Sequence, residues 1–178
     1  MKKFIMPDFT HCNINVSATL AEFLGAPNAN ATLPLLKNEL AKGYKNVVFI
    51  CFDGMGVHPL SVNLEETDYL RANIKDTLTS TFPSTTTCAT TSLTTNRLPL
   101  EHGWFGWSVY FDKIKRNVNI FLDTDSWTDE KLNVEGLSPL GVFPYYFDRE
   151  SADCEYEIST LFPTFIQVAR PERNTKWN

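Results

Sequence analysis

Paired cysteines are missing from this sequence. The four cysteines show no CxxC spacing and lack the density of a disulfide framework: Cys12, Cys51, Cys88 and Cys154. This scatter is typical of reduced thiols in the cytosol, so we expect a cytoplasmic protein. Cys51 and Cys88 are expected to be buried.

Long apolar runs and basic clusters are also missing. The N-terminal MKKFIMPDF has too few apolar residues for a signal peptide, and no later stretch has the length of a membrane span. The net charge is −5 with no cluster of Lys and Arg, which argues against nucleic-acid binding through a basic surface. We therefore expect neither a membrane nor a nucleic acid as a partner.

What the chain does contain is enough apolar sequence for one ordinary core, since 43% of its 178 residues are hydrophobic. The predicted helices of the first half cover residues 17–24, 33–42 and 64–73. Ser17 is placed to cap the first helix, while Gly25 and Gly43 can close the first two. The small polar residues of 26–31 predict an exposed loop.

Residues 47–52 read VVFICF, an uninterrupted apolar run of strand length. Such runs are typical of strands buried on both faces of a parallel sheet. The run ends in Asp53-Gly54-Met55-Gly56, and a carboxylate at the carboxyl end of a central strand lies where open α/β sheets bind ligands. The ordinary alternative is a turn in which Asp53 bonds nearby backbone N–H groups.

The stretch from Thr79 to Trp107 reads TSTFPSTTTCATTSLTTNRLPLEHGWFGW. Residues 78–82 are predicted to form a strand, and the hydroxyl-rich residues 84–87 to start a helix, where side chains can cap backbone N–H groups or an anion can bind. A threonine run is also ordinary strand or capping material. If strands 47–52 and 78–82 are parallel neighbours, Asp53 and Thr86 emerge at the same edge.

FICFDGMG followed by STFPSTTTCATTSLTTNRLPLEHGWFGW resembles the N-terminal half of the alkaline phosphatase superfamily, in its type I phosphodiesterase and nucleotide pyrophosphatase branch. The resemblance implies a three-layer αβα fold with a mostly parallel sheet, of which residues 1–178 would be the N-terminal part of a single domain. It also implies a hydrolase of small phosphoesters. Asp53 would be a ligand of one of two divalent metals, usually zinc, and Thr86 the nucleophile that contacts the same metal.

The sequence departs from the family pattern at two places. Asn96 stands where the family most often has Gly, although Asn tolerates the left-handed conformation. Trp104 to Trp107 stand where nucleotide-hydrolysing members often carry an Asn. The resemblance therefore does not imply specificity for nucleotides. Phosphomonoesters, phosphodiesters and sulfate esters all stay open as substrates. Pro99, His102 and Gly103 would form the turn after the nucleophile helix.

The C-terminal part is predicted to contain a hairpin over residues 108–122, a loop over 123–146, a helix over 157–170 and the start of a strand over 171–178. The family takes its other metal ligands from its later half. His58, expected in a loop, and His102 are interpreted as structural residues. Asp123 and Asp125 are expected to be exposed loop carboxylates that cannot replace those ligands.

We therefore interpret the chain as the truncated, nucleophile-bearing half of a metal-dependent phosphodiesterase-like hydrolase. At most part of one metal site would be present, so the chain alone is predicted to be inactive. An exposed sheet edge could support self-association. The alternative is a catalytically silent relative that binds an anion or a partner chain.

Overall fold

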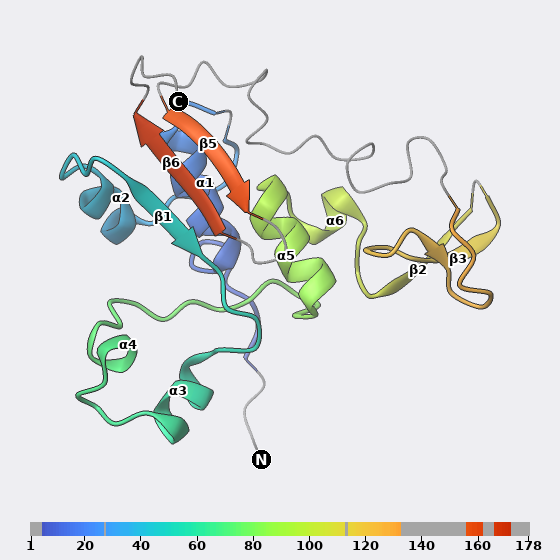
Figure 1. The fold of residues 1–178 in the computed structure, drawn as a ribbon, viewed down its shortest axis with the longest axis horizontal. Coiled ribbons are helices and arrows are strands. Elements are labelled where there is room, and N and C mark those ends of the chain that lie inside the picture. The colour runs from blue at the N-terminus through green and yellow to red at the C-terminus, as the bar shows by residue number, and fades with distance from the viewer. Residues whose placement is uncertain (1–4, 27, 113, 133–155, 162–165, 172–178) are drawn as a thin grey trace, which may run out of the picture. The chain divides into compact units, whose positions relative to one another are not determined.

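Residues 5–26, 28–112, 114–132, 156–161 and 166–171 are described in a computed structural model, shown in Figure 1. The structure is mixed α/β, which is the fold class that the sequence predicts. Its contacts group into two compact units, which are described separately. Unit 1 comprises Met1–Tyr44 and Thr79–Glu155, and unit 2 comprises Lys45–Leu78 and Tyr156–Asn178. A membrane-spanning helix is not found within the described ranges.

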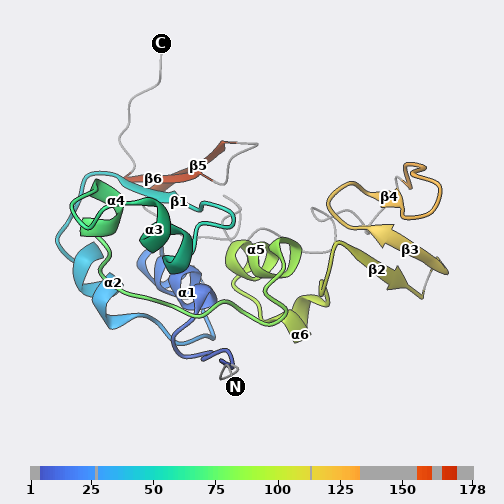
Figure 2. The ribbon, with the colours of Figure 1, turned by 90° about the horizontal axis from the view of Figure 1, so that it is seen from below.

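The described helices of unit 1 are α1 (Asn13–Phe23), α2 (Pro34–Leu40), α5 (Thr86–Thr95) and α6 (Pro99–His102). Helix α1 packs against both α2 and α5, and Figure 2 shows α1 beside α5. Ile14 and Ala18 of α1 and Cys88 of α5 are fully buried. Burial of these side chains supplies the hydrophobic contribution that holds the two helices together.

Helix α1 begins earlier than the sequence predicts. Ser17 is buried inside the helix, so its predicted role as the cap is wrong. The helix begins after Cys12, whose backbone N–H donates to Asn15 Oδ1 at 2.7 Å. A side chain three residues into a helix can satisfy the capping position in this way. Gly25 has φ 72°, which confirms it as the residue that closes the helix.

The loop predicted over residues 26–31 is only partly exposed, because its described asparagines bind the C-terminal end of α5. Asn30 Nδ2 donates to the Asn96 carbonyl at 2.7 Å, and Asn96 Nδ2 donates to Asn28 Oδ1 at 3.0 Å. Asn96 is 4% exposed and has φ 53°. Its left-handed conformation ends α5, which agrees with the tolerance of Asn for this conformation.

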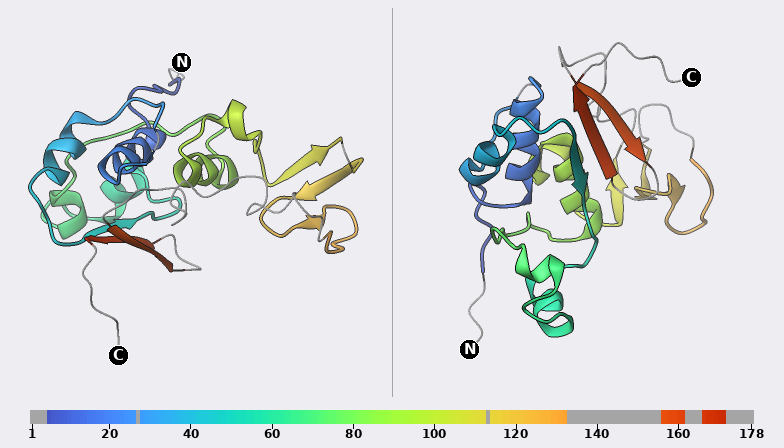
Figure 3. Two further views of the ribbon diagram at one scale, coloured as in Figure 1. Left: turned by 90° about the horizontal axis from the view of Figure 1, so that it is seen from above. Right: turned by 60° about the vertical axis from the view of Figure 1, so that its left-hand side comes forward.

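The predicted hairpin over residues 108–122 is confirmed. Strands β2 (Ser108–Phe111) and β3 (Arg116–Asn119) pair antiparallel, and the two-residue strand β4 (Thr124–Asp125) adds to β3. Figure 3 shows these strands in yellow and orange. Residues 133–146 of the predicted loop lie outside the described residues.

Unit 2 contains β1 (Val47–Ile50), α3 (Val57–Asn63), α4 (Tyr69–Ala72), β5 (Tyr156–Leu161) and β6 (Ile166–Pro171). The helix predicted over 64–73 is reduced to α4, and α3 was not predicted. The helix predicted over 157–170 is wrong, since β5 and β6 pair antiparallel there. Pro163 would interrupt a helix. Residues 172–178 lie outside the described residues.

The predictions for the sheet also need correction. Strand β1 pairs antiparallel with β6, not with a parallel neighbour, and the sheet order is β1-β6-β5. Its side chains alternate between half-buried and exposed, so it is not buried on both faces. Residues 78–82 form no strand beyond one parallel bridge between Cys12 and Thr79. Cys88 is buried as predicted, whereas Cys51 is half-buried.

Asn96→Ala should lower the free energy of unfolding more than Asn96→Gly does. Alanine disfavours the left-handed conformation and also removes the side-chain hydrogen bonds, so we expect the free energy of unfolding to fall by about 3 kcal/mol. Glycine adopts this conformation readily and removes only the hydrogen bonds, so the expected decrease is about 1.5 kcal/mol. Urea unfolding monitored by circular dichroism measures both. Equal losses of stability in the two variants would show that the left-handed backbone conformation of Asn96 does not affect stability.

Candidate functional site

The start of α5 carries the residue predicted to be the nucleophile. Thr85 is the residue before the helix and has extended backbone angles, and Thr86 is the first helical residue. The side chain of Thr85 makes no capping hydrogen bond to this ten-residue helix. Helix N-termini carry backbone N–H groups and a partial positive charge, both of which favour an anion.

The three threonines at this helix start are not equivalent. Thr87 is fully buried, which removes its hydroxyl from any substrate. Thr85 Oγ1 lies 3.2 Å from Thr87 Oγ1 and is hydrogen-bonded to it. Thr86 is half-buried at the first position of α5. Burial therefore excludes Thr87 as the hydroxyl that meets a ligand, whereas Thr85 and Thr86 are both half-buried.

Asn13 of α1 fixes the position of this helix start, and sequence reasoning missed it. Asn13 Oδ1 accepts a hydrogen bond from the Thr81 backbone N–H at 3.0 Å, and Asn13 Nδ2 donates to the Ala89 carbonyl at 3.2 Å. One amide thus binds both the segment entering α5 and α5 itself. No local sequence signal reveals this contact, because Asn13 and Ala89 are 76 residues apart.

The entering segment is also held by backbone bonds. The Thr79 N–H donates to the His11 carbonyl at 3.2 Å, and the Asn13 N–H donates to the Thr79 carbonyl at 3.0 Å. Cys88, in the first turn of α5, is fully buried, and burial raises the pKa of its thiol. The thiol therefore stays protonated and contributes packing rather than reactivity.

His102 fixes the turn that follows α5. Its Nδ1 accepts a hydrogen bond from the Trp104 N–H at 3.0 Å, so the ring proton belongs on Nε2. That nitrogen lies 2.9 Å from Ser92 Oγ and donates to it. Burial lowers the pKa of His102 to about 4, which the nearby Glu101 charge only partly opposes. Both ring nitrogens of a neutral imidazole are thus engaged, in accord with the structural role expected for this residue.

Asp53, the second predicted site residue, belongs to unit 2. It is exposed in the turn that follows β1, where Gly54 takes φ 67° and Gly56 precedes α3. The positive φ explains the need for glycine at position 54. His58 lies in α3 and not in a loop as expected, and it is exposed. Asp53 and Thr86 belong to separate units. That their side chains form one site therefore stays a prediction.

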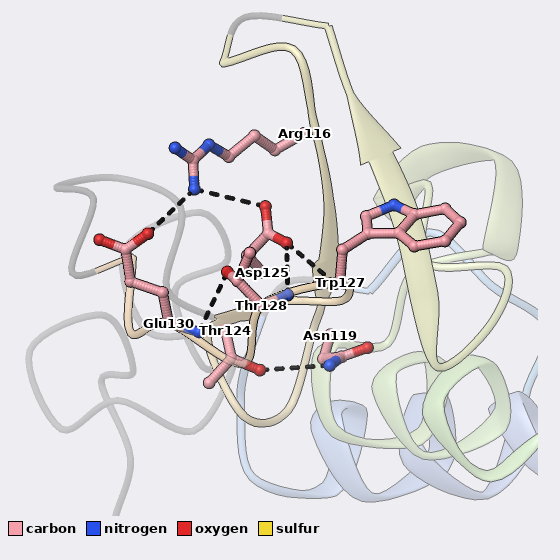
Figure 4. Close-up of polar contacts among 7 residues, drawn as sticks. All are labelled: Arg116, Asn119, Thr124, Asp125, Trp127, Thr128 and Glu130. Carbon is pink, nitrogen blue, oxygen red and sulfur yellow. Dashed lines mark hydrogen bonds and ion pairs between the residues drawn. The ribbon is translucent and has the colours of Figure 1, made fainter.

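Asp125 is not the exposed loop carboxylate that the sequence suggests. It is 5% exposed, and its Oδ1 accepts hydrogen bonds from the backbone N–H groups of Trp127 at 2.9 Å and Thr128 at 3.1 Å (Figure 4). Arg116 Nη1 bridges Asp125 Oδ2 at 3.4 Å and Glu130 Oε2 at 3.2 Å. The bond from the Trp127 N–H is the main cause that lowers the pKa of Asp125. This carboxylate organises a turn.

Within the described residues, no group of three or more His, Cys, Asp or Glu side chains is arranged to hold a metal ion. Comparisons with protein-family models, with curated proteins and with solved structures find no match for this chain.

The protonation of His102 should make stability depend on pH. Since its pKa falls from 6.5 to about 4 on folding, the unfolded chain binds more protons between these values. The free energy of unfolding should be highest above about pH 6.5 and decrease by up to about 3 kcal/mol as the pH falls toward 4. Urea titrations across this pH range measure the effect.

Two variants separate this effect from other titrating groups. His102→Gln should remove most of the decrease between pH 6.5 and 4, whereas Ser92→Ala should lower stability at every pH and keep the slope. A His102→Gln profile that follows the parent protein would show that another group titrates.

Proposed function

We propose that this chain carries the nucleophile-bearing part of a metal-dependent phosphoester hydrolase of the phosphodiesterase and nucleotide pyrophosphatase type. The observation that supports this most is the position of Thr86 as the first residue of α5, after Thr85, which makes no side-chain capping bond, and before the buried Thr87. The sequence resemblance assigns the nucleophile to the same threonine. A cytoplasmic location is proposed with it, from the unpaired cysteines.

The hydroxyl of Thr86 would attack the phosphorus atom of the substrate. The P–O bond to the leaving group would break, the leaving group would take a proton, and Thr86 would become phosphorylated. The backbone N–H groups of the first turn of α5 would bind the phosphoryl oxygens as negative charge develops on them. Water would then hydrolyse the phosphothreonine and restore the hydroxyl.

Asp53 and Thr86 would share one divalent metal, for which zinc is the first candidate. Their oxygen donors suit a hard divalent ion, but they make up only part of one site. When bound, such ions favour deprotonation of a hydroxyl and stabilise the attacking and leaving oxygens. Further Asp and His ligands would have to come from other parts of the complete protein.

The complete protein is proposed to have a three-layer αβα fold with a mostly parallel sheet. The parallel bridge between Cys12 and Thr79 supports this proposal. The antiparallel pairing of β1 with β6 does not. A small phosphoester is the proposed substrate. The residues of the site are compatible with a phosphomonoester, a phosphodiester and a sulfate ester.

A second candidate is a catalytically silent relative that binds an anion. The N-terminus of α5, where Thr85 makes no side-chain capping bond, favours it, since the backbone N–H groups can hold an anion without any metal. The two candidates differ in whether the Thr86 hydroxyl reacts.

In the protein encoded by the complete reading frame, Thr86→Ala should abolish hydrolysis of bis(p-nitrophenyl) phosphate in the presence of zinc. Thr85→Ala should retain a substantial part of the activity, because Thr85 bonds Thr87 and does not react. Thr86→Ser restores a hydroxyl and should recover part of the rate. Equal losses in Thr86→Ala and Thr85→Ala would contradict the assignment of the nucleophile, and full activity in Thr86→Ala would refute it.

The 178-residue chain by itself should bind zinc weakly and should not bind two ions. Asp53 and Thr86 offer two oxygen donors, whereas a tight zinc site usually has four ligands. Isothermal titration calorimetry with zinc chloride tests this, with an Asp53→Asn variant as the control. Two tight sites per chain would mean that ligands have been overlooked.

A further inference from the structure

Asp53 is followed by a glycine in an exposed turn. Strand β1 ends at Ile50, and Asp53 and Gly54 form a turn after it in which both residues are exposed. Gly54 has φ 67°, and a Cβ atom at this position would meet no atom within 4 Å, so the surroundings of the residue are open. The sequence contains no other Asp-Gly pair and no Asn-Gly pair.

An aspartate side chain can react with the backbone nitrogen of the residue that follows it. Here the nitrogen of Gly54 would attack Cγ of Asp53, and the new C–N bond would close a succinimide ring. A water molecule would leave, made from a carboxyl oxygen, its proton and the amide hydrogen. Water would then open the ring at either carbonyl. One opening restores aspartate, and the other gives isoaspartate, in which the main chain runs through the former side chain.

The residue after the aspartate decides how readily this ring closes. A side chain on that residue crowds the attacking nitrogen and restricts the backbone rotation that brings the nitrogen to Cγ, whereas glycine does neither. A hydrogen bond from the same N–H would have to break first. Within the described part of the chain the Gly54 N–H makes no hydrogen bond, and Gly54 lies between β1 and α3 rather than inside either. The nitrogen of Gly54 is therefore accessible and held by no regular structure.

Asp76, in the same unit, provides an internal comparison. It is exposed like Asp53, and its Oδ1 accepts a hydrogen bond from the Thr77 N–H at 2.7 Å, so its carboxylate lies beside the next backbone nitrogen. Thr77 is β-branched, however, and its side chain crowds that nitrogen and limits rotation. Asp76 thus has exposure and proximity, but it lacks the glycine that permits ring closure at Asp53.

We propose that Asp53 is a site of spontaneous isoaspartate formation through a succinimide with Gly54. The reaction uses water and the two residues themselves, and it needs no oxidant, metal or enzyme. Isoaspartate adds a methylene group to the main chain after β1 and shortens the side chain that carries the carboxylate. Asp53 is also the proposed metal ligand, so the modification would move that oxygen donor. Its formation does not depend on the proposed hydrolase function.

Incubation of the folded chain in mildly acidic, metal-free buffer, followed by peptide mapping with an isoaspartate-specific methyltransferase, tests the proposal. Isoaspartate should accumulate at Asp53 at least about tenfold faster than at Asp76. Gly54→Asn should slow the reaction at least about tenfold, because Asn tolerates a positive φ but places a side chain beside the nitrogen. The matched control is Gly56→Ala, which should leave the rate unchanged. Gly56 has φ −86°, and a Cβ atom there would meet no atom within 4 Å, so alanine fits without strain.

Three results would overturn the proposal. Absence of isoaspartate at Asp53 in the folded chain would do so, and a parallel sample in urea would show whether the fold prevents the reaction. Equal rates at Asp53 and Asp76 would show that the glycine is not the cause. Equal slowing by Gly54→Asn and Gly56→Ala would contradict attack by the Gly54 nitrogen. These measurements use neither metal nor substrate, so their outcome is separate from that of the hydrolase proposal.

Discussion

The side-chain amide of Asn13 is the interaction on which the candidate site depends most. It binds the Thr81 N–H before α5 and the Ala89 carbonyl inside α5, and so joins three segments distant in sequence. Asn13 is half-buried, where a hydrogen bond is stronger than in water and an unpaired group costs more. The position of the Thr86 hydroxyl follows from where this amide holds the helix start.

The C-terminal end of α5 is fixed by different polar contacts. The asparagines before α2 bind Asn96, and neutral His102 bonds Ser92 within the helix. At the other end of α5, the side chain of Thr85 makes no capping hydrogen bond. A helix held at Ala89, Ser92 and Asn96, whose N-cap side chain makes no capping bond, is suited to bind an anion at its start with little rearrangement. The hydrolase proposal depends on this arrangement.

The helices of unit 1 could be predicted from sequence because their signals are local. Gly25, Asn96 and the hydroxyl-rich start of α5 mark helix ends through their own backbone and side-chain preferences. The start of α1 was missed because Ser17 looks like a cap, whereas Asn15 satisfies that position from inside the helix. Contacts such as that of Asn13 with Ala89 leave no local trace and become visible only in the folded chain.

The sheet predictions failed for a related reason. The apolar run of β1 fits a central parallel strand, but strand pairing depends on partners that the run itself does not specify, and β6 supplies an antiparallel one. The apolar residues of 157–170 have helical spacing, but Pro163 interrupts the segment, and the antiparallel pairing of β5 with β6 is not visible in that spacing. Asp125 looked like a loop carboxylate because its bonds to backbone N–H groups are invisible in sequence.

The central claim, that the first turn of α5 receives a phosphoryl group, is tested most directly by amide nuclear magnetic resonance of the ¹⁵N-labelled chain titrated with inorganic phosphate. Sodium chloride at matched ionic strength serves as the control. The account predicts saturable shifts of the amides of Thr86, Thr87 and Cys88 with phosphate and none with chloride. Unchanged amides in this turn, or equal shifts with both salts, would contradict it.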